Sequence, residues 1–252
     1  MSTTTLQAEF AARGFIPRLR VHDAAAAAAV REQFDAVEAA EGPERCQIGL
    51  LDRHWDDRFV WDVAAHPAIL NAVQEVMGPD VMLLATHFFC KYPEEGEPTR
   101  FVAWHQDVTY WGLDPPFALT AWYAVDDADV GNGCMRVVPG THAAIREHGK
   151  SGRAGNLLSI NQEVPTTPDE EASAVDLCLR AGEISLHHGM LIHGSNPNCS
   201  RRRRCGLTIR YTRPDVRQTQ LNSNKRSYRA ILLRGEDQCH HFDDLQPPFP
   251  LP

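Results

Sequence analysis

The run RCGLTIRY at residues 204–211 alternates polar and apolar side chains, the pattern of a β-strand with one apolar face. Because successive side chains of a strand point to opposite faces, the run divides into two sets. An arginine that such a strand directs inward suits bidentate binding of a carboxylate, and a glycine two residues along leaves room beside it. The apolar side carries Cys205, Leu207, Ile209 and Tyr211, and the polar side carries Arg204, Gly206, Thr208 and Arg210.

Short runs that look like strands recur from residue 81 to residue 212, separated by clusters of Gly, Pro, Asn and Asp. Such spacing is typical of a β-sandwich or a barrel-like fold. We therefore expect a mainly β fold with flanking α-helices, a double-stranded β-helix (jelly roll, cupin-like). The expected strands cover residues 81–85, 87–89, 100–108, 117–125, 134–138, 157–163, 183–188 and 204–212.

The N-terminal third is expected to be mainly helical. One helix is predicted over residues 6–14, and a second runs from its N-cap Asp23 through the alanine run to about Ala40. Residues 67–77 begin at a proline and stop at Gly78, an asymmetry that favours a third helix.

The remaining segments complete the predicted domain organisation. Residues 15–19 predict a short strand, which a proline places at a sheet edge, whereas residues 44–64 show no clear period. The long connection at residues 143–156 is a candidate lid. We expect one domain over residues 1–252, with residues 1–79 as mainly helical support, 80–212 as the jelly-roll core and 213–252 as a C-terminal wrap or lid.

Composition and charge exclude several classes of protein. Of the 252 residues, 43% are hydrophobic and 23% are charged, as in ordinary globular proteins. The net charge of −8 argues against a general nucleic-acid binder, and no apolar run reaches the length of about 18 residues that predicts a membrane span. The N-terminus lacks the basic and apolar regions of a signal peptide. Seven cysteines without a CxxC pair indicate free thiols, so we expect a cytoplasmic protein.

The run WHQD at residues 104–107 holds a histidine and a carboxylate two residues apart. On an extended strand His105 and Asp107 point the same way, and His193 is the best candidate for a third ligand from a distant strand. Two histidines and a carboxylate on one face of a metal are typical of non-haem Fe(II) oxygenases. The residues alone leave two alternatives open. One is a hydrolase with Zn²⁺ on the same three side chains, and the other is a non-catalytic cupin-like module that binds a metabolite.

Further motifs carry a resemblance to a known family. They lie within residues 80–212, and Arg204 stands eleven residues after His193. With them the chain resembles the phytanoyl-CoA dioxygenase family of Fe(II)- and 2-oxoglutarate-dependent oxygenases. Besides WHQD, the matching motifs are LTAW at residues 119–122, NGCM at 132–135, VPGTH at 138–142, Gly182-Glu183, His188, HGS at 193–195, and Arg204.

The resemblance implies a metal site and a reaction. His105, Asp107 and His193 would bind Fe(II), and 2-oxoglutarate and O2 would be converted to succinate and CO2. The implied activity is hydroxylation of an unactivated C–H bond of a small organic metabolite. Asp107 favours hydroxylation over halogenation, because related halogenases have a small residue at that position. Desaturation, epoxidation or cyclisation would use the same residues.

The resemblance also implies a site for the cosubstrate 2-oxoglutarate. Arg204 would pair with its distal carboxylate, and Ser195 would be a hydrogen-bonding neighbour. Trp122 would line the cosubstrate pocket, and Lys91 would make a polar contact near the site. The expected partners are a small-molecule substrate and, at most, a second copy of the chain, which gives a monomer or a homodimer.

Other polar residues near these motifs have two readings each. His187 and His188 contact substrate or ligands in one reading and form structural hydrogen bonds in the other. His142 is expected to stabilise its turn rather than to touch iron, and Gln162 to face either substrate or solvent. Residues 201–203, which are all arginine, are expected to form a solvated turn.

Overall fold

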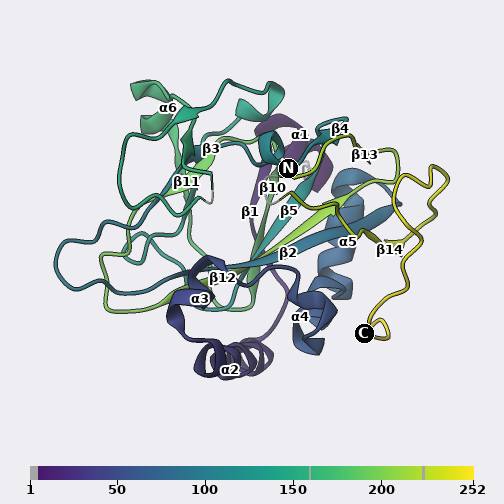
Figure 1. Ribbon diagram of the computed structural model, residues 1–252, viewed down its shortest axis with the longest axis horizontal. Helices are drawn as coiled ribbons and strands as arrows, with labels where there is room; N and C mark the ends of the chain where they lie inside the picture. The colour runs from purple at the N-terminus through teal and green to yellow at the C-terminus, as the bar shows by residue number, and fades with distance from the viewer. Residues whose placement is uncertain (1–4, 159, 223–224) are drawn as a thin grey trace.

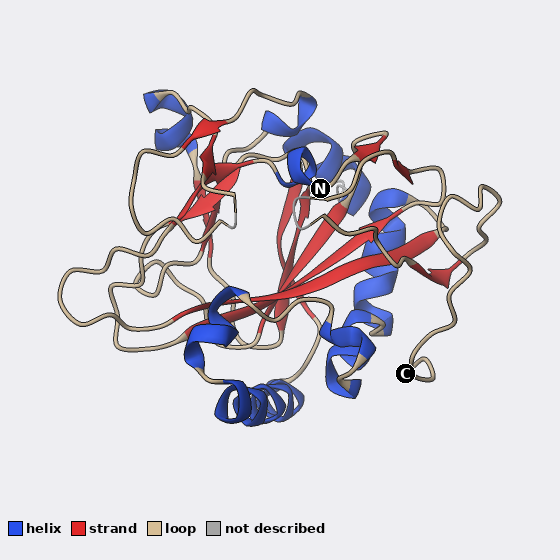
Figure 2. Ribbon diagram, in the orientation of Figure 1, coloured by secondary structure: helices blue, strands red, loops and turns tan. Residues whose placement is uncertain are grey.

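The computed structural model describes residues 5–158, 160–222 and 225–252 (Figure 1). Two antiparallel sheets form its centre, and helices pack beside the larger one (Figure 2). In chain order the elements are α1 (Leu6–Arg13), β1 (Phe15–Arg20), α2 (Ala24–Glu41), α3 (Pro43–Ile48), η1 (Arg53–Trp55), α4 (Arg58–Ala64), α5 (Pro67–Met77), β2 (Val81–Lys91), β3 (Val102–His105), η2 (Asp107–Tyr110), β4 (Leu113–Asp114), β5 (Leu119–Ala124), β6 (Met135–Val137), η3 (Thr141–Ala143), β7 (Gly149–Lys150), β8 (Gln162–Glu163), α6 (Pro168–Ser173), β9 (Val175–Leu177), β10 (Glu183–His188), β11 (His193–Ser195), β12 (Arg204–Thr212), β13 (Arg217–Gln218) and β14 (Ile231–Arg234).

The larger sheet has six strands in the order β1-β10-β5-β12-β2-β14, and the smaller sheet has four in the order β3-β11-β6-β9. Every pairing in these two sheets is antiparallel. β1 lies at the edge of the larger sheet, where its proline needs no partner on the outer side. The expectation of a mainly β fold with flanking helices is confirmed.

Strand β12 lies in the middle of the larger sheet, between β5 and β2. On its apolar side Leu207 and Ile209 belong to the same buried cluster as Phe34 of α2. Tyr211 is also fully buried there, and its hydroxyl donates a hydrogen bond to the carbonyl of Ala64 at 2.6 Å. The helices therefore cover one face of β12, which leaves the other face to the interior between the sheets.

The helices α2 and α5 lie where the sequence predicts them. The Asp23 side chain caps α2 by accepting a hydrogen bond from the backbone N–H of Ala26 at 2.9 Å. Helix α5 begins at Pro67 and stops before Gly78, whose φ of 107° suits glycine.

The structure adds the helices α3 and α4 in a region whose sequence shows no clear period. Helix α4 has only seven residues, so its exposed pair Arg58–Asp62 and its buried residues repeat too few times to give a helical period. The amphipathic signal is consequently missing. The buried residues of α4 are Val60, Trp61, Val63 and Ala64.

Two of the expected strands are wrong in part. The strand expected over residues 100–108 ends at His105, and Asp107 begins the 3₁₀-helix η2. Of the strand expected over residues 157–163, only the short β8 forms, with Ser159 outside the described residues. In the C-terminal tail, β14 pairs with β2 and extends the larger sheet.

Two further findings bear on the remaining expectations. No helix within the described ranges combines the length and the apolar character needed to span a bilayer. All seven cysteines are free thiols, as the sequence predicts. The division of residues 1–252 into support, core and tail within one domain stays a prediction.

Candidate metal and cosubstrate site

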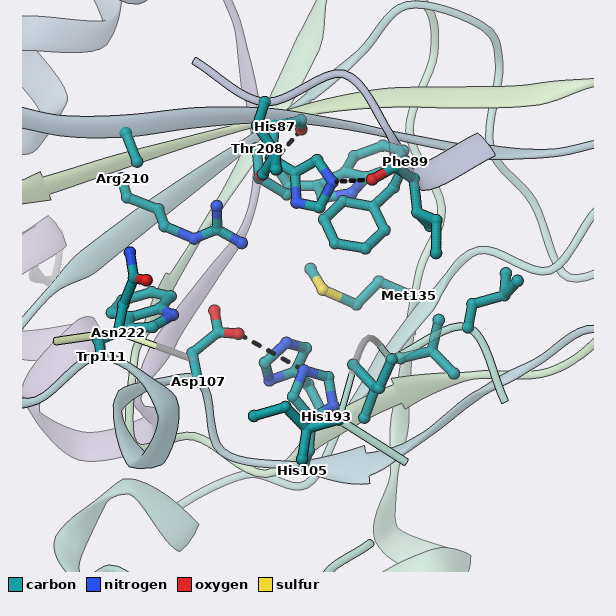
Figure 3. A pocket seen from close by; sticks show the side chains of 18 of the residues that line it. His87, Phe89, His105, Asp107, Trp111, Met135, His193, Thr208, Arg210 and Asn222 are labelled. Carbon is teal, nitrogen blue, oxygen red and sulfur yellow. Dashed lines mark hydrogen bonds and ion pairs between the residues drawn. The ribbon is translucent and has the colours of Figure 1, made fainter. Parts of the chain in front are cut away.

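Three predicted ligands lie together where the two sheets face a common cavity (Figure 3). His105 ends β3, and His193 begins β11 directly opposite it in the antiparallel pairing. The candidate ligand atoms of His105, Asp107 and His193 all lie within 4.8 Å of one another. All three side chains are buried, so the structure brings together in one compact group the residues that sequence spacing alone could only suggest.

Hydrogen bonds orient both imidazoles toward a common point. Nδ1 of His105 lies 2.9 Å from the carbonyl of Ala103, and Nδ1 of His193 lies 3.0 Å from the carbonyl of Leu191. Since a carbonyl can only accept, each Nδ1 carries the proton and each Nε2 presents a lone pair. Backbone carbonyls that accept from the far ring nitrogen commonly fix histidine ligands of metals in this way, so the site fits a divalent cation.

Asp107 reaches the site from a turn rather than from the expected strand. Gln106 is extended, with φ −120° and ψ 124°, and it sends the chain into η2. Its buried amide donates to the carbonyls of Ala144 at 2.8 Å and Met190 at 2.5 Å, and it accepts from the backbone N–H of Arg146 at 2.7 Å. Gln106 thereby fixes the turn that aims Asp107, a positioning role that the sequence did not indicate.

The protonation states suit metal binding. Burial would raise the pKa of Asp107, but its contacts with His105 and His187 and the charge of Arg210 outweigh burial and hold the pKa well below its usual range. Burial lowers the pKa of His193 well below its usual value. An ionised carboxylate beside a neutral imidazole is the state that a metal ligand set requires.

Arg204 lies in the same cavity, which has a volume of about 230 Å³. Its side chain is buried, its guanidinium stacks on the ring of Trp122 at 5.5 Å, and its Nε has no hydrogen-bond partner within the described chain. A buried guanidinium without a protein acceptor is costly unless a ligand supplies one. This orphaned donor fits a carboxylate-bearing cosubstrate.

Gly206 makes room for the ring of Trp122. A Cβ at Gly206 would lie 2.0 Å from a ring carbon of that tryptophan. The glycine therefore lets Trp122 pack flat against β12, next to Arg204.

Ser195 and Lys91 form a buried pair beside Arg204. Nζ of Lys91 donates to Oγ of Ser195 at 2.5 Å and to the carbonyl of Asn196. Ser195 lines the cavity, whereas Lys91 is absent from its described lining and pairs with Arg204 across the β12–β2 ladder. Burial, followed by the charge of Arg204, lowers the pKa of Lys91 well below its usual value. Lys91 thus contacts the site through Ser195.

The other histidines differ in their environments. His187 lines the cavity with its Nε2 3.8 Å from Asp107, and neither of its ring nitrogens has a hydrogen-bond partner among the described residues. His188 accepts from the backbone N–H of Met190 and lies in edge contact with Phe117, which is a structural role. His142 contacts the carbonyl of Ala11 at 3.1 Å.

Two polar expectations resolve differently. Gln162 pairs with Lys150 in the short β7–β8 hairpin and is absent from the described cavity lining. The expectation of a solvated turn is wrong for Arg203, which bonds to Asp35, Glu38 and Asp126. Arg203 joins α2 to the end of β5 because its side chain leaves the strand on the helix side.

Several cavity residues were not singled out from the sequence. Arg210 follows Arg204 on the same polar side of β12, so the alternation that identified Arg204 could have identified it too. The C-terminal tail was expected to be a wrap or lid, but the sequence did not indicate which of its residues reach the cavity, because their approach depends on how that tail folds back. The additional lining residues are Asp52, His87, Phe89, Met135, Asn222, Arg226 and Tyr228.

This fold and site define a class of two-sheet proteins with a candidate two-histidine, one-carboxylate centre. The sequence profile of phytanoyl-CoA dioxygenases (PhyH) matches residues 10–206, which is more than half of the chain. The chain therefore belongs to the phytanoyl-CoA dioxygenase family.

Individual relatives agree with this assignment. The human peroxisomal phytanoyl-CoA dioxygenase is 27% identical over 175 residues, which are 69% of this chain and 52% of that protein. An L-proline trans-4-hydroxylase of Streptomyces griseoviridis is 29% identical over 201 residues, 73% of each chain. The chain spans about half the length of the phytanoyl-CoA dioxygenases that it matches.

Solved structures share the fold. The non-heme monooxygenase ThoJ in its apo form superposes with a TM-score of 0.77 at 29% identity, covering 96% of this chain and 88% of that chain. The expected double-stranded β-helix is confirmed by this likeness.

Proposed function

We propose that this chain is an Fe(II)- and 2-oxoglutarate-dependent oxygenase that hydroxylates an unactivated C–H bond of a small organic molecule. The observation that carries the proposal is the meeting, in one cavity, of three buried ligand side chains and a buried arginine whose Nε has no hydrogen-bond partner among the described residues. Family membership supports the same conclusion. A zinc hydrolase on the same triad would leave Arg204 without a ligand.

The metal would be held by His105, Asp107 and His193. Such a facial set leaves coordination positions open for cosubstrate and O2. When bound, Fe(II) supplies the oxidising chemistry, in which 2-oxoglutarate and O2 become succinate and CO2 as the substrate is oxidised. The protein contributes fixed imidazole orientations, an ionised carboxylate and a buried site that limits access of water.

The cosubstrate would be held at the Arg204 end of the cavity. Arg204 offers parallel N–H donors to the distal carboxylate of 2-oxoglutarate, a bidentate geometry that guanidinium favours. Ser195 would add a hydroxyl, held in place by Lys91. Trp122 would form the apolar wall and keep the guanidinium flat.

The substrate and the setting are open to finer proposals. One relative is named as a hydroxylase of L-proline, which supports a small metabolite rather than a long thioester. The C-terminal tail contributes Asn222 and Tyr228 to the cavity, so we propose that it covers the opening. A cytoplasmic location and a monomeric or homodimeric state stay predictions.

Succinate formation tests the proposed function. Purified protein supplied with Fe(II), ascorbate, 2-oxoglutarate and air should release succinate slowly even without substrate, and faster with a suitable one. Replacing Fe(II) by Zn²⁺ should abolish release. Absence of succinate under all conditions, together with Zn²⁺-dependent hydrolysis of a test ester, would favour the hydrolase.

A further inference from the structure

A second buried arginine, Arg210, faces the same cavity from the same strand. Its side chain is only 8% exposed, and it points into the cavity above Asp107 (Figure 3). It stands six residues from Arg204, a spacing of about 20 Å along a strand. The two guanidiniums also lie on different rings, Arg204 on Trp122 and Arg210 on Trp111, so they belong to different parts of the cavity.

Arg210 lacks the partners that a buried guanidinium normally has. Its Nε has no hydrogen-bond acceptor within the described chain. Trp111 supports the charge through a cation–π contact at 4.9 Å, but a ring face accepts no pair of N–H bonds. The oxygens of Asp107 contact His105 at 3.5 Å and His187 at 3.8 Å, and a bound metal would occupy them further.

The charges of the filled cavity also lack a balancing anion. If the proposed function holds, Fe(II), Asp107, the 2-oxoglutarate dianion and Arg204 balance one another. Arg210 and the exposed Arg226 then face the single carboxylate of Asp52. The neighbouring His87 adds no positive charge, since burial lowers its pKa to about 3. Because Arg226 is exposed to solvent, the balance depends on Asp52, and burial raises the pKa of that carboxyl, so Arg210 is incompletely neutralised.

Part of the cavity wall suits an uncharged body. Aliphatic side chains from two segments, residues 48–51 and 157–160, line this part, and none of them offers a polar group. A ligand with one anionic end and an apolar remainder would match both features. The aliphatic residues are Ile48, Leu51, Leu157, Leu158 and Ile160.

We propose that Arg210 binds a carboxylate of the substrate, so that the substrate is a small carboxylic acid with an otherwise apolar body. Its acid group lies in a different part of the cavity from the distal carboxylate of 2-oxoglutarate, and its body extends toward the metal ligands. This assignment rests on the proposed function for the identity of the ligand at Arg204. It assigns a separate role to each arginine of β12.

Matched acids and amides test the assignment. The probes are straight-chain and branched aliphatic monocarboxylic acids, each paired with its primary amide. Binding is measured anaerobically by calorimetry and by thermal shift, on protein with and without Fe(II) and 2-oxoglutarate. At least one acid should bind wild-type protein about 10-fold or more tightly than its amide, because a charged hydrogen bond is lost in the amide.

Variants at Arg210 locate the effect. Arg210→Met should weaken binding of that acid about 10- to 100-fold and leave the affinity for its amide within about 2-fold. Arg210→Lys keeps the charge without the planar pair of donors, so it should bind the acid with an affinity between those of the wild type and of Arg210→Met. Arg180→Met is the matched control. It removes an exposed arginine that is not among the described residues lining the cavity, so it should bind the acid as the wild type does.

The outcomes separate this assignment from the proposed function. The assignment is overturned if no acid binds wild-type protein, if acids and amides bind equally, or if Arg210→Met binds acids as wild type does. If Arg210 served only to stabilise Asp107, its loss would weaken metal binding without changing the preference for acid over amide. If acids bind through Arg210 but the protein forms no complex with Fe(II) and 2-oxoglutarate, the assignment of Arg210 is supported and the proposed oxygenase function is contradicted.

Discussion

The two faces of strand β12 are equally buried and chemically opposite. On the helix face Leu207 and Ile209 pack in the core, and the one polar group, the hydroxyl of Tyr211, has an acceptor. On the cavity face Arg204 and Arg210 each keep an Nε without a partner in the described chain. The two faces are equally buried but differ in hydrogen bonding. The protein itself supplies an acceptor for the Tyr211 hydroxyl on the helix face, whereas the arginine Nε atoms on the cavity face fit acceptors that a ligand would supply.

The neighbouring arginines 203 and 204 carry the same contrast in adjacent residues. Arg203 points to the helix side and bonds to Asp35, Glu38 and Asp126. Arg204 points to the cavity and stacks on Trp122. The guanidinium of Arg203 therefore has carboxylate partners within the protein, whereas the Nε of Arg204 has no partner among the described residues.

The largest expected effect comes from removing the carboxylate on the cavity side. Asp107→Ala should lower succinate release at least about 100-fold, because even partners outside the ligand shell of a metal are worth 10- to 100-fold. The fold should stay intact, so the far-UV circular dichroism spectrum of the variant should match that of the wild type. Asp169→Ala, on the exposed first turn of α6, is the matched control. Succinate release at the wild-type rate would exclude Asp107 as a ligand.

Arg204→Leu should raise the 2-oxoglutarate concentration for half-maximal turnover. The loss of one partner from a buried charged pair costs about 2–5 kcal/mol, or about 30-fold to several thousand-fold. Arg201→Leu changes an exposed arginine three residues earlier and should leave the requirement unchanged. An unaltered requirement in Arg204→Leu would mean that another arginine binds the cosubstrate.

The free energy of unfolding should respond differently to substitution of the two neighbouring arginines. Arg203→Met should lower the free energy of unfolding by about 3 kcal/mol, because Asp126 and Glu38 lose their partner in a largely buried network. Arg204→Met should not lower it when 2-oxoglutarate is absent, since no protein acceptor is left unpaired. Urea unfolding of both variants measures the difference. Equal losses would show that Arg204 has a structural partner.

A smaller effect is expected from His54, which is fully buried on the helix side of β2. Its Nδ1 lies 2.9 Å from Oγ1 of Thr86, and burial lowers its pKa from 6.5 to about 4. Between these values the unfolded chain binds the proton and the folded chain does not, so stability falls as pH falls. The contribution should be about 2 kcal/mol between pH 6.5 and pH 5. In His54→Leu the free energy of unfolding should fall by about 2 kcal/mol less between pH 6.5 and pH 5 than in the wild type. The same fall in both proteins would show that His54 does not have a lowered pKa.

Local patterns were sufficient for part of the fold. The strict alternation of residues 204–212 predicts β12 with both faces correct, and the proline-to-glycine span of residues 67–78 predicts α5. Helix α4 could not be predicted, because its seven residues are too few to show a helical period. Two-residue strands such as β13 form only once the chain has folded back on β4.

The candidate site was predictable in composition more than in geometry. His105 and Arg204 lie on strands whose pattern is local, whereas the three-residue strand β11, which carries His193, was not among the expected strands. Asp107 reaches the same point by a turn that depends on three hydrogen bonds of Gln106 to distant backbone. The contribution of the tail to the cavity is likewise a matter of tertiary packing, which single-residue patterns do not encode.

The most direct test is an anaerobic titration of the metal-free protein with Fe(II) and 2-oxoglutarate, followed by visible absorption. A weak charge-transfer band should appear only when both Fe(II) and 2-oxoglutarate are present, and it should saturate at one Fe(II) per chain. The band should be lost in His193→Ala and in Arg204→Ala. Tight retention of Zn²⁺ with no such band in the wild-type protein would contradict the proposed function.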